Sequence, residues 1–251
     1  MTDSNSIERW RTAYQDNAGK LTGAQLPWLT QARDAALENF MASGFPTRRD
    51  EEWKYTGIAP IEKEIGSIAL EAGPVDVEVV QNYLLADLPS HTLVFVDGHF
   101  NAALSRVESL PNGAILDSVS NVLLQDAERL QAYLQNPAED RWFAAMNRAL
   151  MTDGAYLELS EGTELDKPVH LLFIASAACS ELAIQPRNII IANRNSRASI
   201  IEHYVGLGDH RYLTNAVTEV ITASDADITH YKVQQEGSQG FHVGSLLTRQ
   251  S

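Results

Sequence analysis

Histidines and carboxylates in the second half of the chain are the residues best suited to bind a metal ion, because imidazole nitrogens and carboxylate oxygens are common ligands of zinc and iron. The histidines of this region are His170, His203, His230 and His242. If neighbouring strands stack at an offset of 28 residues, His203 faces Tyr231 and His230 faces Glu202, so no two histidines meet. A diagonal cluster of Glu202, His203 and His230 is then the candidate metal site. Partly exposed histidines with ordinary hydrogen bonds are the simpler interpretation.

The other reactive groups predict no catalytic centre. Cys179 lies in a run of small residues without a basic neighbour, so an inert thiol is expected. Gly19-Lys20 is followed by Leu21, so it is no phosphate-binding loop, and the sequence contains no Gly-x-Ser-x-Gly or His-Glu-x-x-His motif. We therefore predict that the protein is not an enzyme and has no catalytic, cofactor-binding or metal-binding residue. The alternative is a solenoid enzyme that acts on a polysaccharide or an acyl group, with acidic and basic side chains clustered in a groove.

Charge and composition exclude several classes of protein. The chain has 251 residues, a net charge of −14 and a pI near 4.8, which argues against binding to nucleic acid or to an anionic membrane surface. A single cysteine excludes an internal disulfide. No signal peptide is visible, and the longest apolar run, at 171–179, is far shorter than the roughly 20 residues of a membrane-spanning helix. We expect a cytoplasmic protein that binds neither nucleic acid nor a membrane.

The elements that must position the histidines belong to a repeat. Residues 189–200 align with residues 217–228 at an offset of 28, so that Ile200 matches Ile228. The second strand of each expected pair begins near residue 168, 197 or 226. Such a period is typical of stacked units, and the runs are short and rich in β-branched residues. The pattern predicts a parallel β-solenoid, with coils about 4.8 Å apart. An antiparallel sandwich with similar hairpins is the alternative.

Three regions are expected along the chain. Residues 1–90 form a helical N-terminal region, residues 91–152 a mixed strand and helix connector, and residues 153–251 a parallel β-helix that is incomplete at its C-terminal end. The sequence ends directly after a strand without a capping helix, whereas a solenoid needs a cap at each end. We therefore expect the N-terminal portion of a longer protein, and the uncapped edge makes a homodimer a candidate assembly.

Several separated motifs resemble the SufB/SufD family of iron–sulfur cluster assembly scaffold proteins. The resemblance begins with the segment Arg-Arg-Asp-Glu-Glu-Trp-Lys-Tyr-Thr at 48–56. The further matching segments lie at 93–98, 145–154, 187–191 and 199–204, together with Pro168. They follow the family's order from about residue 25 onwards. With its single cysteine the chain resembles the SufD-type member, because SufB-type chains carry more cysteines.

The resemblance implies a flattened right-handed parallel β-helix after a mostly helical N-terminal region, which agrees with the repeat. It implies a non-enzymatic scaffold that pairs with a SufB-type partner, and with a SufC-type ATPase through C-terminal helices beyond this sequence. The assembled complex builds nascent Fe–S clusters and passes them on, and a reduced flavin is associated with such complexes. The family's cluster-related histidine also lies beyond Ser251, so no cluster ligand is assigned to His203, His230 or any other residue here.

The family signature at 49–56 is expected to be structural. Its residues are Arg49, Glu52, Trp53, Lys54, Tyr55 and Thr56. Trp53 and Tyr55 would bury a large apolar area, while Arg49, Glu52 and Lys54 would form ion pairs around the rim. A direct role in docking a partner is the alternative.

Overall fold

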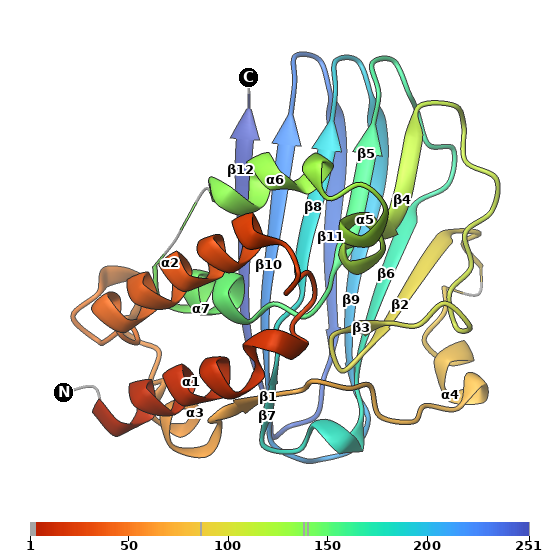
Figure 1. The fold of residues 1–251 in the computed structure, drawn as a ribbon. Coiled ribbons are helices and arrows are strands. Elements are labelled where there is room, and N and C mark those ends of the chain that lie inside the picture. The colour runs from red at the N-terminus through yellow and green to blue at the C-terminus, as the bar shows by residue number, and fades with distance from the viewer. Residues whose placement is uncertain (1–3, 86, 138, 140, 251) are drawn as a thin grey trace.

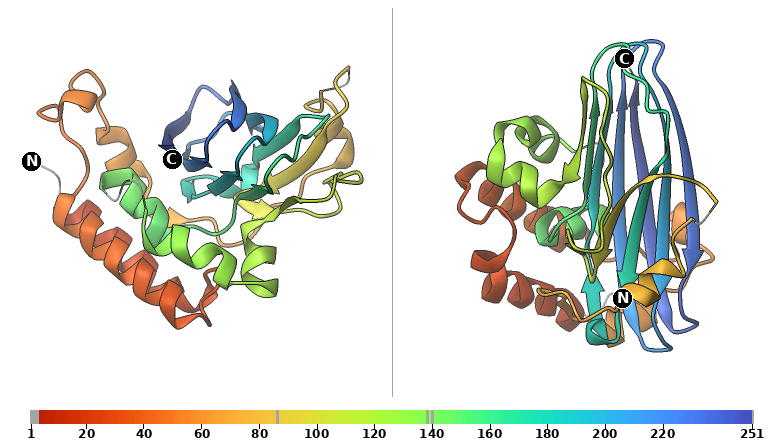
Figure 2. Two further views of the ribbon diagram at one scale, coloured as in Figure 1. Left: turned by 90° about the horizontal axis from the view of Figure 1, so that it is seen from above. Right: turned by 90° about the vertical axis from the view of Figure 1, so that its right-hand side faces the viewer.

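A flattened β-solenoid of about three turns forms the body of the protein, and most of the helices lie beside one of its outer faces (Figure 1). The computed structural model describes residues 4–85, 87–137, 139 and 141–250. In side view, two walls of strands stand face to face, and the helices of the N-terminal half gather beside one wall (Figure 2). The predicted fold class, a parallel β-helix preceded by a mostly helical region, is confirmed.

Two sheets form these walls. Sheet A has the spatial order β1 (Ser67–Ile68), β7 (Leu182–Ile184), β10 (Tyr212–Thr222), β8 (Arg187–Ala192), β5 (Ala155–Leu159), β4 (Ala114–Ser118), and β12 (Gly240–Gln250) pairs with β10. Sheet B has the order β11 (Asp227–Gln235), β9 (Arg197–Gly206), β6 (Val169–Ala175), β2 (His91–Val96), β3 (His99–Phe100). In the described residues these pairings are parallel, except β2 with β3 and β4 with β5. Stacked parallel coils, and not hairpins, therefore build the second half of the chain.

The register differs from the predicted offset of 28 in two of the three last pairings. Arg187 lies opposite Val217 and Arg197 lies opposite Asp227, both 30 positions apart, so the prediction is wrong there. Tyr212 of β10 lies opposite Gly240 of β12, at the predicted 28. The longer coil is set by its corners, which turn at residues with positive φ, Asn195 and Asp225. These are also 30 positions apart, and Asn and Asp tolerate this left-handed conformation better than most residues.

The interior of the solenoid is filled by alternate side chains of each strand. Phe95, Phe173 and Tyr204 come from neighbouring strands of sheet B, and their rings stack at centroid distances of 4.8 and 4.9 Å. Leu171 and Ile200 are buried in the same core. Side chains of the same kind therefore stack on one another in neighbouring strands, as expected for a solenoid.

The helices cover the outer face of sheet A. They are α1 (Ser4–Asn17), α2 (Pro27–Ser43), α3 (Ala59–Glu64), α5 (Val119–Gln125), α6 (Glu128–Gln135) and α7 (Trp142–Leu150), with short 3-10 turns at Ala18–Lys20, Glu51–Trp53 and Ala177–Cys179. The short α4 (Val77–Gln81) lies apart from them, near β2 (Figure 1). Pro27 opens α2, where its missing N–H is harmless, and Gly44 ends it at φ 64°. Phe40 of α2 and Phe143 of α7 are buried in one core cluster, so these helices are packed by their apolar faces.

A buried network of hydrogen bonds and one ion pair connects α7 to sheet A. Arg187 of β8 and Glu219 of β10 form an ion pair, and both side chains are almost completely buried. Arg187 Nη1 also donates to Asn147 Oδ1 of α7 at 3.1 Å. Asn147 Nδ2 donates in turn to the main-chain oxygens of Pro186 and Asn215, at 2.9 and 2.8 Å. Buried charges need such partners, so this network holds the helix layer in one position on the sheet.

Strands of both sheets come from the expected connector at 91–152. β2 and β3 belong to sheet B, and β4 belongs to sheet A. The division of the chain at 90 and 152 stays a prediction. Physically, the first coils and the later coils share one continuous interior, because Phe95 of β2 stacks on Phe173 of β6.

Candidate functional site

A charged cluster lies inside the solenoid near its last strands. Glu202 of β9 points inwards between Ile200 and Tyr204, and its side chain is fully buried. Its carboxylate is 2.9 Å from His230 Nε2 and 3.8 Å from Lys232 Nζ, both on the neighbouring strand β11. The buried carboxylate of Glu202 therefore has one imidazole and one ammonium group as charged or titratable neighbours.

Further hydrogen bonds complete the surroundings of Glu202. The hydroxyl of Tyr204 donates to Glu202 Oε2 at 2.7 Å. Thr218 of β10 donates to Oε1 from the opposite sheet, and Asn188 Nδ2 donates to the Thr218 oxygen at 3.0 Å. The carboxylate thus links sheet B to sheet A through side chains, and each of its oxygens has more than one partner.

A second carboxylate and histidine lie close to the first pair. Glu236 Oε2 is 2.8 Å from His242 Nδ1, and Glu236 also accepts from Thr214 and Tyr212, at 3.2 and 3.3 Å. The ring of His242 contacts the ring of Tyr204 edge to face, at a centroid distance of 4.6 Å. Tyr204 therefore connects the two Glu–His pairs, since its hydroxyl binds Glu202 and its ring packs on His242.

Both carboxylates are held in the ionised form. Burial works to raise the pKa of Glu202, but the hydrogen bond and charge of His230, together with Lys232, outweigh it and lower that pKa. For Glu236 burial is likewise outweighed by His242, Gln234 and Thr214, and its pKa is lowered. Each ionised carboxylate can therefore only accept hydrogen bonds from the side chains around it. Among the described residues no three His, Cys, Asp or Glu side chains are grouped so that they could hold a metal ion.

The predicted cluster of Glu202, His203 and His230 does not form. Glu202 and His230 meet, but His203 lies on the opposite face of β9, because consecutive strand residues point to opposite sides. His203 instead contacts His170 of β6 on the outer face, with 3.2 Å between Nδ1 and Nε2 and the rings stacked at 5.4 Å. The strands β9 and β11 are offset by 30 residues and not by the predicted 28, so His230 lies opposite Ile200 and not opposite Glu202.

Protonation of the His170–His203 pair is expected to destabilise the fold below about pH 6.5. Burial, and then the charge of His203, lowers the pKa of His170 to about 4, and burial lowers that of His203. The unfolded chain therefore binds protons that the folded chain does not. The contribution of the neutral histidine pair to the free energy of unfolding is complete above the ordinary histidine pKa. It is lost as the pH falls towards 4, by roughly 3 kcal/mol for His170. Urea unfolding between pH 7.5 and 4 measures it, and His170→Leu should show the shallower pH dependence. Equal slopes would contradict the assignment.

Cys179 has a basic neighbour that the sequence does not reveal. Its thiol is buried, and Sγ lies 3.6 Å from His210 Nε2, a residue 31 positions away in the chain. Burial nevertheless raises the pKa of Cys179 well above its usual value, and the nearby Asp97 raises it further. The expected unreactive thiol agrees with these surroundings.

The family signature lies on the surface of the helical layer. The Trp53 side chain is half-buried, with its ring 5.4 Å from that of Phe143. Tyr55 is 90% exposed, so the expectation that it would be buried is wrong. Lys54 lies over the Tyr55 ring, at 5.5 Å from its centroid. The Trp53 ring packs against Phe143. The residues that follow the 3-10 turn at Glu51–Trp53 are exposed to solvent.

The expected ion pairs of the signature are also not observed. Arg49, Glu52 and Lys54 are exposed, and among the described residues no ion pair joins any two of them. Thr56 is exposed as well, and its amide donates to the Trp53 oxygen at 3.0 Å. A structural role of the signature stays a prediction that depends on Trp53 alone.

Trp53→Ala is expected to lower the free energy of unfolding by about 1–3 kcal/mol, because the ring loses its contact with Phe143 and the core around it. Tyr55→Ala is the matched control and should change stability by less than about 0.5 kcal/mol, since that ring is in solvent. Chemical denaturation measures both. A Trp53→Ala variant as stable as the control would show that the signature is not structural.

Sequence reasoning missed Lys232 and Glu236 in the interior cluster. The alternation of Ile228, His230 and Lys232 along β11 is the signal that could have placed His230 and Lys232 on one face. Glu236 lies after the end of β11, so no periodicity assigns its direction. Among the described helices, none combines the length and apolarity needed to cross a membrane.

Two family models together match almost all of the chain. Residues 4–171 match the SufBD protein N-terminal region, and residues 173–251 match the SufBD core domain of SUF-system FeS cluster assembly. An iron–sulfur cluster assembly SufBD family protein of Synechocystis is 28% identical over 97% of this chain and 55% of its own length. The iron–sulfur cluster assembly protein SufD of Escherichia coli is 26% identical over 95% of this chain and 52% of its own.

A chloroplastic protein of Arabidopsis thaliana, ABCI7, is 22% identical over 95% of this chain and 50% of its own length. The chain thus spans about half the length of the curated relatives it matches. Because the two family models together match nearly every residue, and SufD is among the relatives, the chain belongs to the SufBD family of iron–sulfur cluster assembly proteins.

Proposed function

We propose that this chain is a non-enzymatic scaffold subunit of a cytoplasmic Suf complex that builds nascent Fe–S clusters and passes them on. The observation that carries the proposal is the match of both SufBD models, over residues 4–171 and 173–251. A SufB-type scaffold and a SufC-type ATPase are the proposed partners. The cluster is the cargo of the assembled complex, and a reduced flavin is proposed to bind there and not to this chain alone.

The last coil supports pairing with another β-helix. Within residues 4–250, β12 pairs with β10 along its whole length and has no strand on its other edge. Leu246 of β12 is a large exposed apolar side chain on the interior-facing row of this strand. Unpaired strand edges take up strands of other chains, so this end favours a partner with the same architecture. A second copy of this chain is the competing occupant.

An enzyme acting on a polysaccharide has less support. Its two carboxylates would have to flank a groove that admits the substrate. Glu202 and Glu236 instead lie inside the solenoid and are bonded to neighbouring side chains. Neither carboxylate is therefore placed to meet a polymer.

Co-purification of the tagged chain with a SufB-type protein and a SufC-type ATPase tests the scaffold role. We expect a stoichiometric complex with the SufB-type protein and no turnover by the isolated chain. Leu246→Asp should weaken this complex about tenfold or more, because a charge would enter the new interface. Leu124→Asp, at an exposed leucine of α5, is the matched control and should leave binding unchanged. A chain that self-associates and does not bind the SufB-type protein would overturn the proposal.

A further inference from the structure

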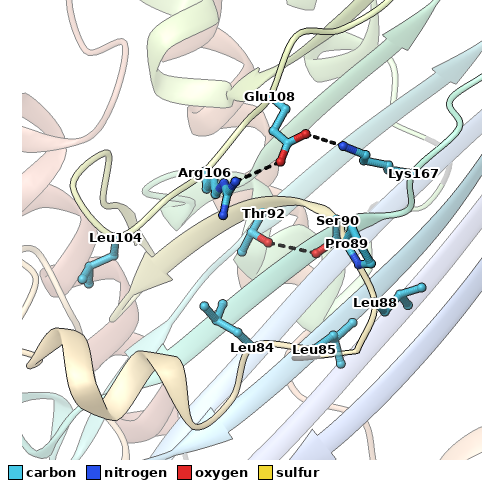
Figure 3. Close-up of a pocket in the computed structure, with 10 residues that line it drawn as sticks. All are labelled: Leu84, Leu85, Leu88, Pro89, Ser90, Thr92, Leu104, Arg106, Glu108 and Lys167. Atoms are coloured by element: carbon cyan, nitrogen blue, oxygen red, sulfur yellow. Dashed lines mark hydrogen bonds and ion pairs between the residues drawn. The ribbon is translucent and has the colours of Figure 1, made fainter.

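A cavity of about 510 Å³ lies between the loop after α4 and the beginning of β2 (Figure 3). This volume is within the usual range of small-molecule pockets, about 300–1,000 Å³. It lies on the α4 side of sheet B, away from the interior cluster and from the edge of β12 (Figure 1). We propose that it binds an amphipathic anion, a small molecule with an elongated apolar body and one carboxylate, sulfonate or phosphate group. This proposal does not depend on the scaffold role.

One wall of the cavity is apolar. It consists of Leu84, Leu85, Leu88 and Pro89 from the loop after α4, and Leu104 also lines the cavity. Leu84 is 37% exposed and Leu88 is 44% exposed, so two large apolar side chains of one wall are in contact with water. An apolar ligand body that covers them removes this surface from water, which favours binding.

The opposite wall carries charges (Figure 3). Glu108 accepts from Arg106 Nη2 at 3.1 Å and forms an ion pair with Lys167. The two hydroxyls of Ser90 and Thr92 lie between the walls, 3.1 Å apart. Two cations thus share a single carboxylate, so the three charged side chains that line the cavity sum to one positive charge.

Arg106 is the group placed to recognise the ligand's anionic end. Its side chain is 79% exposed, and its bond to Glu108 uses one of the two terminal nitrogens. In the described part of the chain the other N–H groups of its guanidinium have no acceptor. A guanidinium binds carboxylate and phosphate oxygens with two parallel N–H groups, so a ligand anion can take this side while its body lies on the leucines.

The charge balance favours an anion over other ligands. A cationic ligand would need the Glu108 carboxylate, which Arg106 and Lys167 already neutralise. A ligand without charge would form no ion pair with the cations of the polar wall. An anion without an apolar body would leave Leu84 and Leu88 in water. The two walls together therefore select for both properties.

Three probes separate these properties in titration calorimetry on the whole 251-residue chain. Dodecanoate has the tail and the anionic end, dodecyltrimethylammonium has the same tail with a cationic end, and inorganic phosphate has the anion alone. We expect dodecanoate, below its critical micelle concentration, to bind at least about tenfold more tightly than either of the others.

Variants assign that binding to the cavity. Glu108→Gln should tighten dodecanoate binding about threefold to tenfold, because both cations become available, and Arg106→Gln should weaken it by a similar factor. Leu88→Asn should also weaken it. Glu161→Gln is the matched control, since Glu161 pairs with Arg194 on an exposed corner and lies outside the cavity lining. Thermal melts of each variant confirm folding.

Three results would overturn the proposal. The first is no detectable binding of dodecanoate by the folded protein. The second is equal binding of the two dodecyl probes, which would make the site merely apolar. The third is an unchanged affinity in Glu108→Gln, or the same change in Glu161→Gln, which would place the anion elsewhere.

Discussion

Replacing Arg187 by methionine is expected to lower the free energy of unfolding by about 3–5 kcal/mol, the usual cost of removing one partner of a buried ion pair. Glu219 would keep its negative charge in a site that is almost fully buried. Among the described residues, the cationic contact left to Glu219 is Arg249 Nη2 at 3.4 Å, from a side chain that is partly in solvent. Asn147 would lose a donor as well, so the attachment of α7 to sheet A would weaken.

Thermal unfolding measures this effect. For a chain of this size about 3 kcal/mol corresponds to a fall of roughly 6–12 °C in Tm. Arg194→Met is the matched control, because its pair with Glu161 is exposed, and it should change stability by less than about 1 kcal/mol. The double variant Arg187→Met/Glu219→Leu should recover part of the loss, since no unpaired charge remains. A single Arg187→Met variant as stable as Arg194→Met would show that the network is not needed for stability.

Gly154→Ala is expected to destabilise the fold by at least about 3 kcal/mol, because the added methyl group has no space. A Cβ at this position would overlap the main chain of Arg187, in the neighbouring strand β8. The atoms it meets belong to the backbone and cannot rotate away. The strand must then shift, and the ion pair of Arg187 with Glu219 shifts with it.

Gly19→Ala is the matched control for this substitution. Nothing lies within 4 Å of a Cβ at Gly19, so alanine fits there without a clash. Its effect should be neutral or slightly stabilising, because alanine restricts the unfolded chain. Chemical denaturation of both variants distinguishes a clash at Gly154 from a general intolerance of alanine. Equal stability of the two would contradict the close packing of β5 against β8.

The repeat in the sequence predicted the solenoid but not its register. The offset of 28 holds for β10 with β12 and is two residues short for β8 with β10. An error of two keeps every side chain on its own face, because strand side chains alternate with a period of two. For this reason the interior and exterior rows were predictable while the opposing residues were not. The corners at Asn195 and Asp225 fixed the true spacing.

The candidate site was only partly predictable for a related reason. The sequence drew attention to Glu202 and His230, and they do meet. The predicted cluster also includes His203, but this residue follows Glu202 directly in the strand and therefore lies on the other face of β9. Tyr55 was expected to be buried because it is aromatic, but its exposure depends on how the turn at Glu51–Trp53 leaves the surface.

By itself the sequence determined the fold class, the family and the direction in which strand side chains point, because these depend on local periodicity and on motifs in a fixed order. Only the tertiary structure decided several other contacts: Cys179 with His210, His170 with His203, and Glu236 with His242. These contacts depend on corner lengths and on the coil-to-coil offset, and a change of two residues in either brings different side chains together without altering the hydrophobic pattern.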